Sequence, residues 1–83
     1  MADKLITYSA GDVIFRQGYP ADDAYIVQSG EVEIFHEEID GSETQLAILK
    51  QGEMFGEMGI LDDAPRNASA RAHTDVVLQI IDL

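Results

Sequence analysis

One segment of the chain combines a glycine-rich turn with an arginine, FGEMGILDDAPRNASARA at residues 55–72. Gly56 and Gly59 allow the backbone to approach a ligand closely, and the first amides of a helical turn have no acceptor within the helix. Unpaired amides of this kind bind anions. Arg66 follows a reversal of the chain, and its guanidinium can offer two parallel donors to a phosphate. The segment therefore predicts an anion site.

Glu57 lies inside the same turn, where a carboxylate would repel a phosphate unless it has another partner. A sugar hydroxyl is such a partner, because acidic side chains accept from the ribose 2′-hydroxyl in dinucleotide-binding folds. Phosphate donors together with one ribose acceptor predict a nucleotide site. The spacing also fits a plain tight bend followed by an arginine in a surface ion pair.

The composition limits the other classes of function. The chain has 83 residues, which supports one small domain with a single core. Sixteen acidic against five basic residues give a formal charge of −11, so we expect no binding to nucleic acid or to an anionic membrane. Cysteine is absent, and no apolar run has the length of a signal peptide or a membrane span. We therefore expect a cytoplasmic protein.

Catalytic and metal-binding motifs are not visible in the sequence. His36 and His73 are the two histidines, and neither has a second ligand at metal-binding spacing, so we assign them no role. The sequence has no Ser-His-Asp set, catalytic carboxylate pair or Walker loop. We predict a protein that is not an enzyme and that holds no metal.

Glycines recur at short intervals between segments rich in β-branched and aromatic residues, which is typical of an all-β sandwich or barrel. Asp40-Gly41 and Gln51-Gly52 predict turns, and helical patterning is confined to 58–61. The segments with the length of a strand are 13–15, 24–28, 31–36, 44–49, 69–72 and 76–81.

The motif at 55–69 resembles the phosphate-binding cassette of the cyclic nucleotide-binding domains, F-G-E-[LI]-[AGS]-L-[LM]-x(n)-P-R-[AT]-A-[ST]. The segments GDVIFRQG at 11–18, AYIVQSGEV at 24–32 and LKQGEMFGE at 49–57 resemble the parts of the family that precede the cassette. The resemblance implies an eight-stranded jelly roll, a double-stranded β-helix, with a short helix in the cassette and flanking helices.

The resemblance also implies residue roles. Glu57 would accept from the ribose 2′-hydroxyl, and Arg66 would pair with the exocyclic phosphate oxygens. Gly59 and Asn67 would donate backbone amides to that phosphate, and Gly56 would let the nucleotide approach. The apolar positions that match the purine side of the family pocket, which core packing alone would also explain, are Ile34, Leu46 and Leu49.

The chain departs from the family pattern at two places. Asn67 stands where the family has Ala, Thr or Ser, and because a hydroxyl there helps some members to favour cyclic GMP, its absence favours cyclic AMP. Family members continue past the last strand into a hinge helix and a lid helix, whereas this sequence stops at Leu83. The resemblance therefore implies one domain at 1–83 that is truncated before its C-terminal helices.

Two functions from different classes follow. The first is a regulatory sensor that binds a cyclic nucleotide and controls an effector domain or subunit outside this chain. The alternative is a nucleotide-free jelly-roll module that uses its acidic surface for interaction or assembly. The presence of both Glu57 and Arg66 favours the sensor, because a pocket that binds nothing needs neither.

Overall fold

A computed structural model describes residues 4–21, 23–57 and 65–81, which form eight strands and no helix. The strands are β1 Lys4–Tyr8, β2 Val13–Phe15, β3 Ala24–Ser29, β4 Val32–Glu37, β5 Glu43–Leu49, β6 Met54–Phe55, β7 Ser69–Ala72 and β8 Val76–Ile81. The helical turn expected at 58–61 lies outside the described residues. Within the described ranges, no helix has the length and apolar character that crossing a membrane requires.

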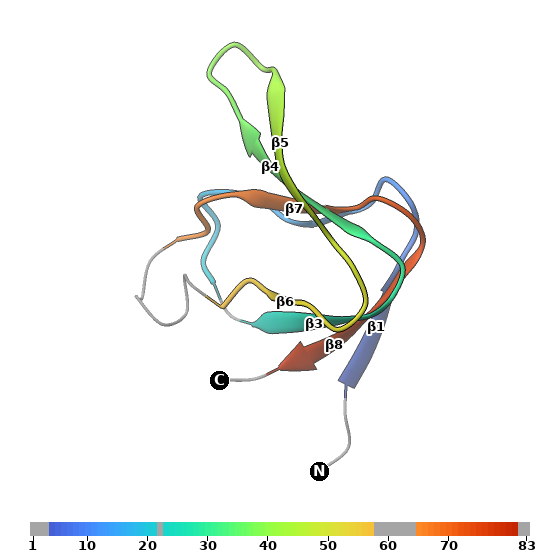
Figure 1. Ribbon diagram of the computed structural model, residues 1–83. Helices are drawn as coiled ribbons and strands as arrows, with labels where there is room; N and C mark the ends of the chain where they lie inside the picture. The colour runs from blue at the N-terminus through green and yellow to red at the C-terminus, as the bar shows by residue number, and fades with distance from the viewer. Residues whose placement is uncertain (1–3, 22, 58–64, 82–83) are drawn as a thin grey trace.

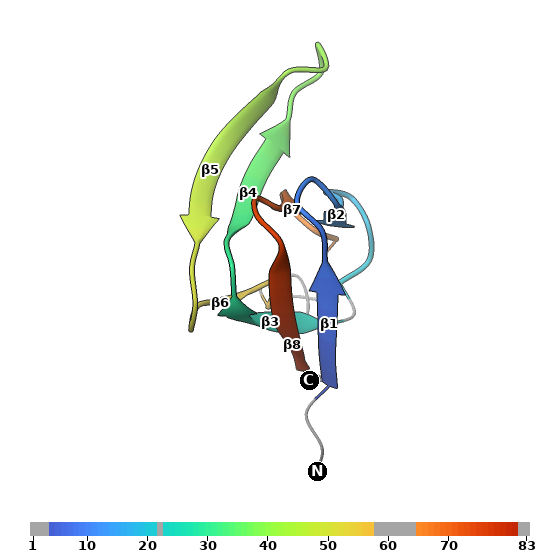
Figure 2. The same cartoon turned by 90° about the vertical axis from the view of Figure 1, so that its right-hand side faces the viewer.

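The strands form two antiparallel sheets of four, in the orders β1-β8-β3-β6 and β2-β7-β4-β5. Successive strands change sheet at every connection except the β4–β5 hairpin, which extends beyond the rest of the molecule (Figure 1). Seen from the side, β8 lies between β1 and β3 (Figure 2). This connectivity confirms the predicted jelly roll.

The core lies between the two sheets and follows from the alternation of apolar side chains along the strands. Val76 and Leu78 are buried on β8, whereas Val77 between them is only partly buried. Small residues on β7 let the sheets approach each other, because Ala70 and Ala72 are fully buried. The complete core cluster is Val27, Val32, Phe55, Ala70, Ala72, Val76 and Leu78.

The sequence did not predict β1. This edge strand pairs with β8 over its whole length, from Lys4 opposite Ile80 to Tyr8 opposite Val76. Its inward residues Ile6 and Tyr8 pack against the core, but Leu5 is 60% exposed. A five-residue strand with an exposed apolar side chain lacks the clean alternation that identifies a strand.

The predicted turns are confirmed. Gly41 has φ +89° and Gly52 has φ +90°, a region that favours glycine. In the β4–β5 turn the Asp40 carboxylate accepts from the Ser42 amide at 2.9 Å and from the Ser42 hydroxyl at 2.6 Å. These two bonds favour the ionised carboxylate and lower the pKa of Asp40.

The outer face of the β2-β7-β4-β5 sheet carries an ion-pair cluster around Arg71. Its Nη2 donates to Glu33 at 2.6 Å and to Glu43 at 2.8 Å, and its guanidinium lies 4.2 Å from the centre of the Phe35 ring. Phe35 lies outside the main core cluster and is nevertheless 1% exposed. Arg71 therefore joins three strands and covers an aromatic ring at the same time.

We predict that Glu43→Gln reduces the stability of the fold at neutral pH and flattens its acid dependence. The hydrogen bond from Arg71 lowers the pKa of Glu43 below its ordinary value. A carboxyl with a depressed folded-state pKa stabilises the fold above its unfolded pKa, and this contribution is lost as pH falls through the folded value. Urea unfolding at pH 7 and at pH 3.5 measures the effect.

The control is Glu53→Gln, in the turn after β5. The difference in free energy of unfolding between the wild type and Glu43→Gln should narrow at the lower pH. The difference between the wild type and the control should not narrow in this way. An equal stability difference between the wild type and Glu43→Gln at both pH values would show that the ion pair with Arg71 does not make stability depend on the ionisation of Glu43.

Candidate functional site

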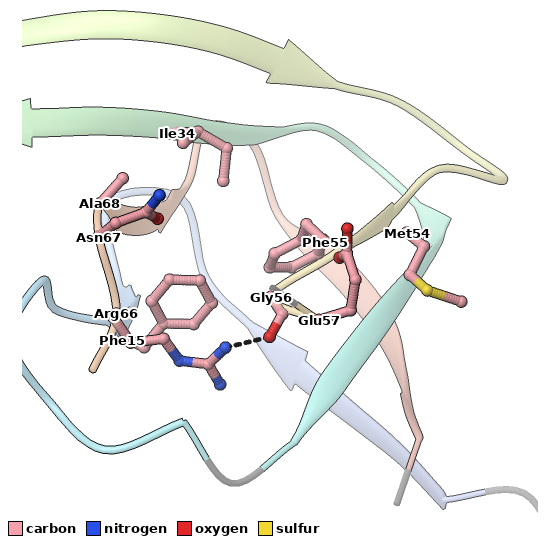
Figure 3. Close-up of a pocket in the computed structure, with 9 residues that line it drawn as sticks. All are labelled: Phe15, Ile34, Met54, Phe55, Gly56, Glu57, Arg66, Asn67 and Ala68. Atoms are coloured by element: carbon pink, nitrogen blue, oxygen red, sulfur yellow. Dashed lines mark hydrogen bonds between the residues drawn. The ribbon is translucent and has the colours of Figure 1, made fainter. Parts of the chain in front are cut away.

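A hollow opens between β6 and the segment that leads into β7 (Figure 3). It brings together five of the eight predicted site residues, namely Ile34, Gly56, Glu57, Arg66 and Asn67. The other lining residues are Phe15, Met54, Phe55 and Ala68. Gly59, the predicted amide donor, lies outside the described residues.

Arg66 is a buried charged side chain of the hollow, only 7% exposed. Its Nη1 donates to the carbonyl oxygen of Gly56, as the dashed line in Figure 3 marks, and its Nη2 donates to the carbonyl oxygen of Asp23 at 2.7 Å. The guanidinium also lies 4.1 Å from the centre of the Phe15 ring. These three contacts fix its plane and direction before any ligand is present.

The Nε–H of Arg66 is buried and has no hydrogen-bond partner among the described residues. An unsatisfied buried donor costs about 1–3 kcal/mol, and more on a charged group. An anionic oxygen in the hollow would satisfy this donor. The chemistry of the side chain therefore fits a phosphate group.

The backbone on either side of Arg66 is tied to the turn that follows β2. The Arg66 amide donates to the carbonyl of Tyr19 at 2.8 Å, and the Gly18 amide donates to the carbonyl of Arg66 at 2.7 Å. The Asn67 amide belongs to the same peptide unit as that carbonyl and points the opposite way, because the peptide is trans. No described residue accepts from this amide, so it is a second donor available to an anion.

Gly56 makes room for Arg66, a role in addition to the predicted one. Its φ is +86°, and a Cβ added there would lie 3.0 Å from Nη1 of Arg66 and 3.4 Å from the Phe15 ring. The missing side chain therefore leaves room for the arginine. The approach of a nucleotide to Gly56 stays a prediction.

The Glu57 carboxylate faces the hollow from the end of β6, across from Asn67 (Figure 3). No described residue donates a hydrogen bond to it. The site thus places hydrogen-bond acceptors on one side and cationic and amide donors on the other, which suits a ligand that carries both a hydroxyl and a phosphate.

The structure does not bring Leu46 and Leu49 to this hollow. Leu46 lies on β5 and is 55% exposed, while Leu49 packs against the core cluster. Ile34 does line the hollow, from β4 (Figure 3). Contact of these three residues with a base stays a prediction.

Sequence reasoning missed Phe15, although its ring packs on the Arg66 guanidinium. Phe15 also belongs to an aromatic group with Tyr25 and Phe55, with ring centres 5.2 to 6.2 Å apart. Phe15 and Arg66 come from distant parts of the chain, so no local spacing could have linked them. The apolar character of 13–15 predicted only a strand.

The profile of the cyclic nucleotide-binding domain family matches residues 5–83 of the chain. The chain is 45% identical over 78 residues to the cAMP-dependent protein kinase regulatory subunit of Emericella nidulans, covering 92% of this chain and 18% of that protein. It is 45% identical over 71 residues to the cyclic AMP receptor protein of Thermus thermophilus, covering 86% of this chain and 33% of that protein. The chain therefore spans about a third or less of the length of these relatives.

Solved structures of the EAL enzyme Bd1971 resemble the chain closely. Its cAMP-bound and cGMP-bound forms match with TM-scores of 0.91 and 0.92, each at 39% identity, covering 95% of this chain and 21% of that chain. The matched segment is thus a minor part of each of these proteins.

Proposed function

The chain belongs to the cyclic nucleotide-binding domain family, and from this premise we propose that the hollow between Glu57 and Arg66 holds the sugar and phosphate of a cyclic nucleotide. The observation that carries the proposal is the buried Nε–H of Arg66, which, like the Asn67 amide, has no acceptor among the described residues. Both donors fit the exocyclic oxygens of a phosphate. Glu57 then accepts from the ribose 2′-hydroxyl. Gly59 supplies a further amide, as the family cassette implies.

We propose cyclic AMP as the preferred ligand. Asn67 lacks the hydroxyl that helps some family members to favour cyclic GMP. Two of the relatives are named for cyclic AMP, while Bd1971 binds both nucleotides in its solved structures. The purine would lie against apolar side chains, of which Ile34 already lines the hollow and Leu46 and Leu49 are the other predicted contacts.

We also propose that the domain acts as a cytoplasmic sensor whose output lies outside residues 1–83. The relatives are named as a protein kinase regulatory subunit, a receptor protein and an EAL enzyme, so we expect the output to differ from protein to protein. A ligand controls such an output only through its different affinities for two conformations. A lid helix after the last strand would be the coupling element, and this chain itself would carry out no catalysis.

Calorimetric titration of the chain in its full natural length with cyclic AMP and with cyclic GMP tests the proposed ligand. We expect saturable binding of both, with the tighter dissociation constant for cyclic AMP. Tighter binding of cyclic GMP would overturn the preference alone. No heat from either nucleotide at millimolar concentration would contradict the proposed function and favour a nucleotide-free interaction module.

We predict that Glu57→Gln weakens cyclic AMP binding by about tenfold, because the charged acceptor for the ribose hydroxyl is lost. The same titration with 2′-deoxy cyclic AMP completes a double-mutant cycle. If the Glu57 carboxylate contacts the 2′-hydroxyl, removing that hydroxyl from the ligand should weaken binding to the Glu57→Gln variant only a little. Additive losses of affinity would show that the Glu57 carboxylate does not contact the ribose 2′-hydroxyl.

A further inference from the structure

His36 contacts the backbone of the segment that lines the hollow. Its imidazole projects from β4, and Nε2 lies 2.9 Å from the carbonyl oxygen of Asn67. A carbonyl only accepts hydrogen bonds, so Nε2 carries the proton and donates. The other ring nitrogen, Nδ1, lies 3.9 Å from a carboxylate oxygen of Glu38. From the sequence alone His36 has no role, but in the structure it contacts the predicted cassette.

The carbonyl that His36 binds belongs to the Asn67–Ala68 peptide unit. The peptide is trans, so the Ala68 amide points away from His36. Ala68 lines the hollow, and none of the described residues accepts from its amide. The preceding peptide is arranged in the same way, because Gly18 binds its carbonyl and the Asn67 amide has no acceptor in the described part of the chain.

The carbonyls of two consecutive peptide units therefore accept hydrogen bonds, one from a backbone amide and one from a side chain. Each unit directs its N–H away from the group that binds its carbonyl, and Asn67 and Ala68 both line the hollow together with Arg66. A hydrogen bond to a carbonyl also polarises the amide of the same unit, which makes that amide a stronger donor. Such amides can donate to an anion that is bound in the hollow.

We propose that His36 is a positioning residue for the bound phosphate, and that it acts by orienting and polarising the Ala68 amide, a donor beyond those of the predicted cassette. The inference rests on the proposed function, because it needs an anion in the hollow. Arg66 supplies the charge, and His36 fixes the direction of a neutral donor beside it. No part of the proposal requires His36 to touch the ligand.

Two substitutions separate this role from simple packing. His36→Leu removes the donor while keeping an apolar side chain of similar size, and His36→Gln keeps an N–H donor at a similar distance from the backbone. The matched control is His73→Leu, at the only other histidine, which lies exposed in the turn after β7. We expect His36→Leu to weaken cyclic AMP binding by about three- to tenfold, with His36→Gln and His73→Leu within about twofold of the wild type.

A second measurement needs no ligand. In the ligand-free protein the Ala68 amide proton should shift upfield in His36→Leu and return towards its wild-type position in His36→Gln. If the wild-type protein binds no cyclic nucleotide, the proposed function fails and the inference fails with it. If the wild type binds, equal affinity of His36→Leu, or a loss that glutamine does not restore, would overturn the inference alone.

Discussion

Arg66→Ala should weaken cyclic AMP binding by about ten- to a hundredfold, equivalent to about 1.5–3 kcal/mol, because it removes the charged donor of the site. The effect on binding arises from the Nε–H, which has no acceptor among the described residues. Calorimetric titration measures the loss. An unchanged dissociation constant in a folded Arg66→Ala variant would remove Arg66 from the phosphate site.

The same substitution is expected to affect stability, because Arg66 also donates to the carbonyls of Gly56 and Asp23 and packs on Phe15. Arg66→Lys provides the second variant. Lysine keeps the positive charge but cannot reproduce the planar fork of donors. We expect it to bind more weakly than the wild type and more tightly than the alanine variant. Thermal unfolding of each variant shows whether the protein is folded under the conditions of the titration.

Gly30→Ala should destabilise the fold by about 2–4 kcal/mol, the largest stability effect that we predict for a single methyl group. Gly30 has φ +85°, and a Cβ added there would collide with the carbonyl oxygen of Asp75. It would also lie 2.8 Å from Cγ1 of Val76 and 2.9 Å from Oγ1 of Thr74. The β3–β4 turn packs directly on the β7–β8 turn, so neither backbone can yield easily.

Gly41→Ala is the matched control, because its φ of +89° is nearly the same but nothing lies within 4 Å of the added Cβ. Its cost should be limited to backbone strain of about 1–2 kcal/mol. Urea unfolding of both variants under one set of conditions gives the difference. Equal losses would mean that strain alone, and not the contact between the two turns, makes glycine necessary at position 30.

The parts of the fold that were predicted correctly depend on local signals. Val76 and Leu78 alternate with half-buried neighbours, and Asp40-Gly41 is a turn whose chemistry lies within four residues. β1 was missed because its inward side chains become meaningful only when the strand pairs with β8, at the other end of the sequence. Pairing of this kind leaves little trace in the local pattern.

The candidate site also has a part that the sequence predicted and a part that it could not predict. The motif at 55–69 placed Glu57, Arg66 and Asn67 together, and the structure brings them to one hollow. Motif spacing could not reveal that Arg66 binds the carbonyl of Asp23, 43 residues earlier, or that His36 binds the carbonyl of Asn67 from another strand. These contacts result from the packing of separate strands, which the order of residues along one segment does not encode.

The measurement that tests the central claim most directly is a crystal structure of the protein with cyclic AMP bound. We predict that the exocyclic phosphate oxygens accept from the Arg66 guanidinium and the Asn67 amide at about 2.7–3.2 Å, and that Glu57 accepts from the ribose 2′-hydroxyl. A nucleotide bound elsewhere, with the Arg66 Nε–H still unpaired, would contradict the account.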